Sequence, residues 1–273
     1  MTTKANPTTV VNSLRPSLPQ GAPGASQARE SSFSIDSELR HVSLIVYAAS
    51  YERVRALVPM EFELEEGEAD GRRVAWLSVV SFLDRDEERG SFEQTSYAAH
   101  VRRNGEPGTW ILGISLGSLG AVATRNLWPL PWHLSAMEID AAYSPVKGRY
   151  AEYGLRTQSE WANASWRIED SGVPVRMEDL AVLPMSLRLP ATTRYFTRRD
   201  GMPGGQRVQA SPAEFTRGRL RAAKCDLLAR LGVLTQEELQ HPFLTAVCPS
   251  MRIESGAPFV LREASPTLLR RAA

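Results

Sequence analysis

Alternation of apolar and polar positions with a period of two runs along most of the chain from Ile35 onward. Residues 41–49 (HVSLIVYAA) and 72–85 (RRVAWLSVVSFLDR) are so rich in apolar side chains that both faces of each strand are expected to be buried. Further strands are predicted at residues 94–103, 109–116, 161–170 and 187–199. An Asn-Gly pair at residues 104–105 and the glycine-rich segment 200–206 supply turns. The pattern therefore predicts a mainly antiparallel β protein.

Short helices are expected at three places between the strands, at residues 51–59, 118–127 and 222–231. Ser50 can cap the first helix, and Gly232 suits the position that follows the third. These helices are few and do not alternate with the strands, which argues against a parallel βαβ sheet. The predicted fold class is mainly β, a β-rich α+β arrangement in which an antiparallel barrel or sandwich carries two or three short helices.

Composition divides the chain into one domain with two tails. Residues 1–34 are rich in Pro, Ser, Thr, Ala and Gln, and they offer too little apolar surface to offset the entropy of ordering, so a disordered N-terminal tail is expected. Residues 35–264 form a single β domain in this interpretation, and residues 265–273 are expected to fray. No apolar run approaches the roughly 18 residues of a membrane span, and no apolar signal-peptide core follows Lys4, so we expect a cytoplasmic protein.

The net charge of +1 is too small for a protein that binds nucleic acid by neutralising many phosphates. The expected partner is a small-molecule ligand or substrate, with neither nucleic acid nor membrane, and a homo-oligomer is left open. Cys225 and Cys248 have no metal-ligand spacing, and we expect buried free thiols in a reducing compartment. The four histidines are also widely spaced, so neither a metal site nor a cofactor is predicted.

Residues 126–138 (NLWPLPWHLSAME) gather two tryptophans, two prolines, a histidine and a carboxylate. Such a segment is typical both of an active-site wall and of the stiff rim of a hydrophobic core, and composition does not decide between them. An acidic stretch, residues 63–71, lacks the ligand spacing of a calcium loop and is expected to be a solvated hairpin. His100, on a strand that runs into charged residues, is expected to face solvent.

A resemblance to a known family is carried by residues 71–82 (GRRVAWLSVVSF), 108–139 (GTWILGISLGSLGAVATRNLWPLPWHLSAMEI), 197–205 (TRRDGMPGG) and 244–253 (LTAVCPSMRI). These segments resemble the YqjF-like bacterial family of the acetoacetate decarboxylase-like superfamily, and the order of elements agrees over roughly residues 38–261. The resemblance implies one β-rich domain around a central, mostly apolar pocket, with the segment Leu130-Pro131-Trp132 at its wall.

In that segment, this chain differs from the acetoacetate decarboxylases that it resembles. In acetoacetate decarboxylases, the element equivalent to Pro131 is followed by a lysine pair, and the first lysine forms an imine with the ketone substrate. Here Trp132 and His133 stand in those places, and neither has the primary amine that an imine requires. Lys147 lies in a turn and is expected to be exposed. Residues 98–99 are alanines where decarboxylases carry a carboxylate, so Schiff-base decarboxylation is disfavoured twice.

Candidate site residues are His133 and Glu138 for catalysis, and Arg125, Trp128, Trp132, Trp110 and Tyr97 for substrate binding. An imidazole near a carboxylate can act as a general acid or base, and a guanidinium can hold a substrate carboxylate. Structural roles compete with each of these: His133 as a core histidine bonded to backbone, Arg125 as compensation of a helix dipole, and the tryptophans as packing.

Two functions therefore remain open. The first is a lyase-like or isomerase-like enzyme that acts on a small oxo-acid or carbonyl metabolite by acid/base catalysis without a Schiff base. The second is a non-catalytic binder of a small apolar ligand. The first requires Trp132 and His133 to adjoin a concave pocket enclosed by the strands of residues 72–82 and 109–116.

Overall fold

A computed structural model describes residues 34–86, 90–124, 127–160 and 163–261. The chain divides into two units, residues 1–31 and residues 32–273, and the first unit lies outside the described residues. The predicted N-terminal tail, apart from its last residue, and the predicted frayed residues 265–273 also lie outside them. In the described part of the chain, no helix is long and apolar enough to cross a membrane.

The described residues are dominated by strands, and the predicted fold class is confirmed. The strands are β1 (Ser34–Ser50), β2 (Glu63–Leu64), β3 (Glu66–Ala69), β4 (Arg72–Asp86), β5 (Gly90–Arg103), β6 (Glu106–Leu116), β7 (Trp132–Leu134), β8 (Ala136–Ser144), β9 (Arg149–Gln158), β10 (Ala164–Pro174), β11 (Ala191–Thr197), β12 (Pro203–Ala210), β13 (Thr216–Cys225), β14 (Leu244–Gly256) and β15 (Phe259–Val260). Between them lie α1 (Tyr51–Arg55), α2 (Gly120–Thr124), α3 (Met177–Leu180), α4 (Met185–Arg188), α5 (Asp226–Arg230) and a 3-10 turn (Glu238–Gln240).

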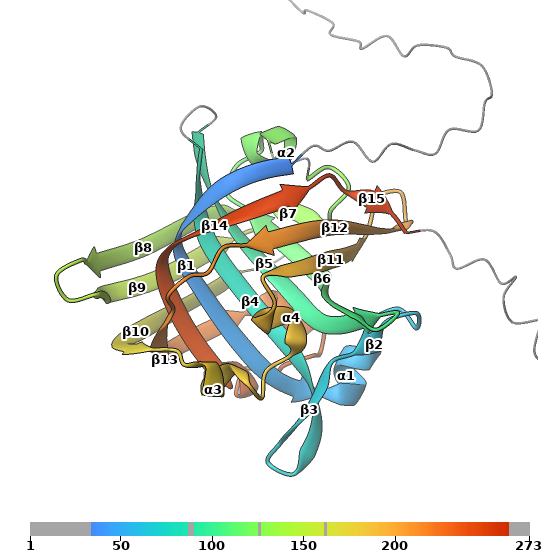
Figure 1. Cartoon of the computed structure of the whole chain (residues 1–273), viewed down its shortest axis with the longest axis horizontal. Helices are drawn as coiled ribbons and strands as arrows, with labels where there is room; N and C mark the ends of the chain where they lie inside the picture. Colours follow the sequence, from blue (N-terminus) through green and yellow to red (C-terminus); the bar gives the residue numbers. More distant parts are fainter. Residues whose placement is uncertain (1–33, 87–89, 125–126, 161–162, 262–273) are drawn as a thin grey trace, which may run out of the picture. The chain divides into compact units, whose positions relative to one another are not determined.

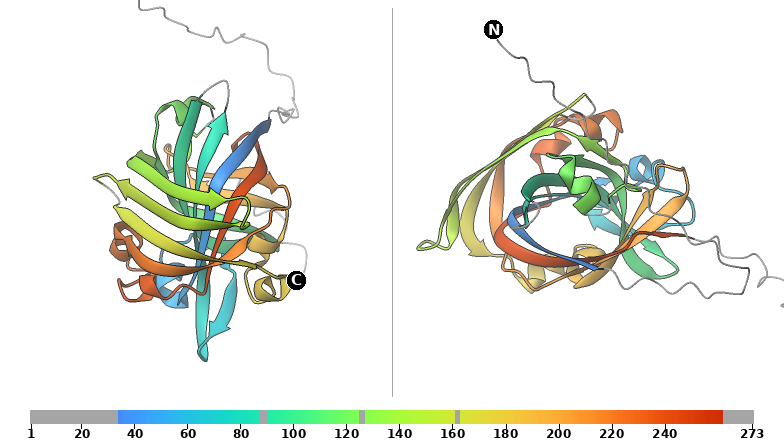
Figure 2. Two further views of the ribbon diagram at one scale, coloured as in Figure 1. Left: turned by 90° about the vertical axis from the view of Figure 1, so that its left-hand side faces the viewer. Right: turned by 90° about the horizontal axis from the view of Figure 1, so that it is seen from above.

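Seven of these strands close into a barrel in the order β12–β11–β6–β5–β4–β1–β14 (Figure 1). The ring is completed by the antiparallel pairing of β12 with β14, in which Val208 faces Ser255 and Ala210 faces Ile253. The β6–β11 contact is parallel, and the other pairings around the ring are antiparallel. Seen from above in Figure 2, the strands form a continuous ring.

The sheet continues from β14 through β13, β10 and β9 to β8, and these four strands cover one side of the barrel (Figure 2). A large apolar core lies between the two layers and joins residues such as Ile45 and Leu77 of the barrel to Tyr153 and Trp166 of the covering strands. β9 and β10 alternate between buried and exposed positions because only one of their faces meets this core.

The double burial predicted for residues 41–49 and 72–85 follows from this arrangement. β1 and β4 are shared by both layers, so Ile45 faces the covering strands whereas Val46 faces into the barrel, and both side chains are at most 1% exposed. The inside of the barrel is closed at one end by α2 and residues Leu127 and Leu130, and at the other by the segment that carries α3 and α4 (Figure 1).

The helices differ from the prediction in number and extent. The first ends at Arg55, and the chain then reaches Phe62 through turns. The second spans only Gly120–Thr124. The third begins at Asp226 because residues 216–225 pair with β10 as a strand, a tertiary contact that overrides helix propensity. α3 and α4 were not predicted, since a single turn has no apolar periodicity to detect.

Candidate functional site

The segment singled out in the sequence forms β7, which runs parallel to β6 with Trp132 beside Ile114 and His133 beside Ser115. Successive side chains of a strand point to opposite faces. Trp132 accordingly packs with the apolar residues that line one end of the barrel, whereas His133 lies on the other face with Ser115. Trp132 and His133 therefore face different environments.

Trp132 belongs to a cluster of aromatic and cationic groups at the end of the barrel that α2 covers, here called the mouth. The Arg199 guanidinium lies 4.1 Å from the centre of the Trp132 ring, and its Nη2 donates to the Trp132 carbonyl at 3.2 Å. Trp128 meets Trp132 edge to face, with ring centres 6.5 Å apart, and is itself 61% exposed. Trp132 Nε1 is buried without a hydrogen-bond partner in the described part of the chain. Trp132 therefore forms part of the barrel wall, and Trp128 its outer rim.

His133 is half-buried and bonded through a side chain rather than through backbone. Its Nε2 lies 2.9 Å from Ser115 Oγ. Burial, with a smaller contribution from the Arg230 guanidinium, lowers the pKa of His133 below the ordinary 6.5, so the ring is neutral at pH 7. A neutral imidazole can accept a proton as a general base in a reaction near this pH.

Tyr97 lies on the same face as Ser115 and is fully buried. Ser115, Thr157 and Cys225 surround its hydroxyl, yet none of the described residues meets the geometry of a hydrogen bond to it. Burial raises the pKa of this phenol, so it stays protonated. The fold thus brings Tyr97 and His133, two of the candidate residues, to either side of Ser115.

The other candidates lie elsewhere. Glu138 is exposed on the outer face of β8, opposite Arg156, and the structure does not bring it to His133. Trp110 is buried in the core between the two layers, with its ring centre 5.0 Å from that of Phe62. Arg125 lies outside the described residues. The seven candidates therefore do not form one constellation among the residues that can be placed.

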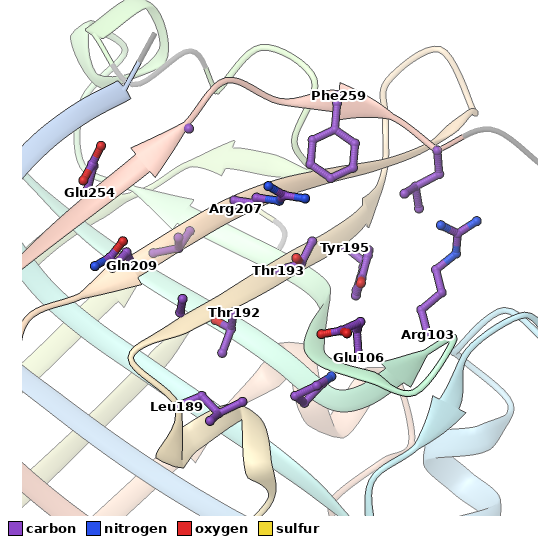
Figure 3. Close-up of a pocket in the computed structure, with 15 residues that line it drawn as sticks. Arg103, Glu106, Leu189, Thr192, Thr193, Tyr195, Arg207, Gln209, Glu254 and Phe259 are labelled. Atoms are coloured by element: carbon purple, nitrogen blue, oxygen red, sulfur yellow. The ribbon is translucent and has the colours of Figure 1, made fainter. Parts of the chain in front are cut away.

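An arginine inside the barrel was missed by the sequence analysis. Thr193, Tyr195 and Arg207 line a groove on the outer surface of β11 and β12 (Figure 3), so their alternating neighbours Arg194 and Gln206 face inward. Arg194 pairs across the strands with Gln206 on one side and with Thr109 on the other.

Protein surrounds the Arg194 guanidinium, and this burial lowers the pKa of Arg194 to about 10. The residue as a whole is only half-buried, so part of it remains accessible. The signal in the sequence was a single charged residue on the face of ATTRYFT that also carries Phe196.

The same inward row continues to His100, which pairs with Thr109. The prediction that His100 faces solvent is wrong: the side chain is 0% exposed because α4 covers it. His100 Nδ1 lies 2.7 Å from Ser186 Oγ, which donates to Glu65 Oε2 at 2.8 Å. Burial lowers the pKa of His100 to about 3, so the ring is neutral, and its Nε2 has no hydrogen-bond partner among the described residues.

Glu65 holds α4 against this end of the barrel. Its carboxylate accepts the backbone N–H groups of Met185 and Ser186, each at 3.2 Å, and the Arg102 Nε at 3.2 Å. The sequence predicted that the acidic stretch 63–71 is a solvated hairpin. The structure differs at one residue, because Glu65 is only 5% exposed. A carboxylate can be buried here because four donors surround it.

The thiols and lysines follow the sequence predictions as far as they are described. Cys225 and Cys248 are buried and free. Lys147 and Lys224 are exposed, and Lys4 lies outside the described residues. Within the described ranges, no group of acidic, histidine and cysteine side chains could hold a metal ion.

Two of the concavities formed by the described residues lie beside the barrel, and a third lies on the covering strands. The outer groove of Figure 3 encloses about 760 Å³ between the β5–β6 hairpin, β11, β12, β14 and β15. A smaller hollow of about 380 Å³ lies at the mouth, lined by Trp128, Pro129, Arg198, Arg199, Asp200 and Pro258. Neither includes His133.

A closed barrel covered by a continuation of its own sheet is the fold of acetoacetate decarboxylase-like proteins, and solved structures confirm the likeness. The enduracididine biosynthesis enzyme MppR with bound HEPES superposes with a TM-score of 0.55 at 14% identity, over 84% of this chain and 88% of that one. An acetoacetate decarboxylase-like enzyme from Sphingomonas wittichii RW1 gives 0.55 at 12% identity, over 84% and 93%. The acetoacetate decarboxylase of Legionella pneumophila gives 0.53 at 12% identity, over 90% and 99%.

Within this class, residues 36–251 match the family DUF2071, described as an uncharacterized conserved protein (COG2071), and the chain belongs to that family. No curated protein matches the chain.

Proposed function

We propose that this protein binds a small oxo-acid or other carbonyl metabolite inside the seven-stranded barrel. The observation that carries the proposal is the accessible surface at the centre of the barrel's inner face. Leu44, Val80 and Thr109 lie in strands that are paired on both sides, and their side chains are nevertheless only half-buried. A closed barrel with covered ends keeps such surface only where it borders an internal space.

We further propose that any chemistry proceeds without a Schiff base. Lys147 and Lys224 are exposed, and Trp132, which the resemblance to decarboxylases sets in the place of the first lysine, packs in the barrel wall. An exposed ammonium keeps its proton at neutral pH and is a poor nucleophile. Structures of MppR hold pyruvate and a condensation product of pyruvate, and by analogy of fold they favour a small carbonyl acid as the ligand.

Acid/base catalysis by His133 is supported by its neutral ring and its bond to Ser115, but not by its position, because His133 and Tyr97 lie on the face of the barrel wall that points away from the interior. A non-catalytic binder is the second candidate. It is favoured by the exposed position of Glu138 and by the placement of His133 on the face of β7 opposite to Trp132.

The test is native mass spectrometry of the purified protein for a copurified small molecule, followed by turnover of an oxo-acid panel monitored by NMR. For an enzyme, we expect His133→Ala to retain ligand and to reduce turnover by about 100-fold, the scale of one general acid/base group. His241→Ala, an exposed histidine in a loop, is the control. Turnover that survives in His133→Ala would remove the catalytic role, and bound ligand with no turnover in the wild type would establish the binder.

A further inference from the structure

Arg194 is a cation inside the barrel without a counter-ion in the described structure. It lies at the middle of an inward-facing row, with Thr109 on β6 and Gln206 on β12 as its cross-strand neighbours. Among the described residues, no carboxylate lies within ion-pair distance of its guanidinium. At pH 7 the group is nevertheless charged, because its pKa of about 10 is well above that pH.

Nearby titratable groups are committed elsewhere. Glu65 serves α4 and Arg102. Glu254 lies opposite Gln209 in the pairing of β14 with β12, and its side chain lines the outer groove (Figure 3). It is therefore on the far side of the barrel wall from the inward-facing Arg194. His100, the other titratable group of the row, is neutral and offers only a lone pair at Nε2. Asp84 on β4 is a buried carboxylate that faces into the barrel beside Phe92, and it has an interaction partner of its own. Arg194 is therefore a guanidinium without an ion-pair partner among the described residues, beside the neutral groups of its row.

An enclosed charge without a partner is strongly unfavourable, and proteins retain one where a ligand of opposite charge completes the site. A guanidinium is a planar fork that matches the two oxygens of a carboxylate. Phe196 lies two residues along the same face and is fully buried, and Trp132 packs against the same apolar cluster. Phe196 thus places an aromatic ring on the inner face next to Arg194 along β11.

We propose that Arg194 anchors the carboxylate of a small organic acid inside the barrel, with the rest of the ligand directed toward Phe196 and Trp132. This inference rests on the proposed function, because it requires the internal pocket, and it adds the charge of the ligand and the residue that binds it. It assigns the role of anion clamp to Arg194, whereas the sequence suggested Arg125.

The experiment compares acids with their uncharged counterparts by isothermal titration calorimetry on the full chain. Pyruvate and acetoacetate are the anionic probes, and pyruvamide and acetoacetamide are the neutral ones. We expect the wild type to bind each acid at least tenfold more tightly than its amide. Arg194→Gln should abolish this difference by weakening the acid alone, and Arg194→Lys, which keeps the charge but loses the fork, should fall between them.

Arg207→Gln is the matched control. Arg207 follows Gln206 on β12, the strand that pairs with the β11 strand of Arg194. Its side chain faces the outer groove (Figure 3), so the difference in affinity between acid and amide should be unchanged. Inorganic phosphate is titrated as a competing anion. Tighter binding of phosphate than of either carboxylate would overturn the assignment of a carboxylate.

The outcomes separate this inference from the proposed function. Equal binding of acids and amides by the wild type overturns the role of Arg194 but leaves the internal pocket. Acid binding that is unchanged in Arg194→Gln has the same meaning. Failure of all the probes to bind overturns both. If Arg194→Gln does not fold, the comparison of acid with amide in the wild-type protein still decides.

Discussion

The inner face of the barrel combines a guanidinium, a neutral imidazole and a hydroxyl from Arg194, His100 and Thr109. Each comes from a different strand, and their proximity follows from the β5–β6 and β6–β11 register alone. A polar side chain can stay inside a barrel only if bonds or a ligand replace the water that it loses. Ser186 replaces that water at one nitrogen of His100, and the other nitrogen has no partner in the described part of the chain.

The buried imidazole predicts a pH dependence of stability. Burial lowers the pKa of His100 from 6.5 to about 3 in the folded protein. Below pH 6.5 the unfolded chain takes up a proton that the folded chain refuses, so this contribution is intact above pH 6.5 and is lost as the pH falls. Between pH 7 and pH 5, we expect the free energy of unfolding to fall by about 2 kcal/mol on account of His100.

Urea denaturation of the wild type and His100→Gln at pH 7 and pH 5 measures the contribution of His100 to the free energy of unfolding. The variant should lose correspondingly less stability on acidification, and His241→Gln, at an exposed position, should follow the wild type. An identical pH dependence in all three proteins would show that His100 is not protected from protonation.

α4 is an element of only four residues, and it owes its position to polar contacts rather than to helix propensity. Glu65 accepts two of its backbone N–H groups and the Ser186 hydroxyl. Leu183 and Leu187 add apolar contacts with the barrel end. The Glu65 carboxylate therefore links α4, which covers one end of the barrel, to β5 through Arg102.

Glu65→Gln should weaken this link, because an amide replaces one acceptor oxygen with a donor that faces other donors. We expect a loss of about 1–3 kcal/mol, the cost of leaving buried polar groups unsatisfied. Hydrogen exchange should become faster at the Met185 and Ser186 amides. Glu63→Gln, two residues earlier and exposed, is the control, and equal effects of the two substitutions would contradict the role given to Glu65.

The two layers of the protein are joined through long strands such as β1, β4 and β5, which contribute one face to the barrel and the other to the core beneath the covering strands. Polar bonds also cross between the layers. The Tyr153 hydroxyl on β9 donates to the His41 carbonyl on β1 at 2.7 Å, where His41 adopts a positive φ of 50° at a bulge. The covering sheet thus stabilises an irregular point of the barrel.

Tyr153→Phe tests this coupling between the layers. Loss of one buried hydrogen bond should reduce the free energy of unfolding by about 1 kcal/mol, measured by urea denaturation. Tyr143→Phe removes a hydroxyl from the same aromatic cluster and should cost less, because no described residue forms a hydrogen bond with it. An equal or larger loss in Tyr143→Phe would contradict the role given to the hydrogen bond between Tyr153 and His41.

The sequence by itself determined the strand-rich fold, its acetoacetate decarboxylase-like type and the double burial of residues 41–49 and 72–85, because each depends on local period or on motifs along the chain. It also predicted free, buried cysteines, from their lack of metal-ligand spacing and the burial preference of unpaired cysteine. It also located the segment around Trp132, although not the faces to which Trp132 and His133 would point.

Only the tertiary structure decided what the barrel encloses. His100, Thr109 and Arg194 are separated by up to 94 positions along the chain, and β-strand register alone brings them into one row. Register also determines that Glu138 points outward. His100 is covered by α4, an element too short to leave a periodic signal in the sequence. Alternation predicts that a strand has two faces, but which face becomes the inside of a barrel depends on how β12 closes onto β14.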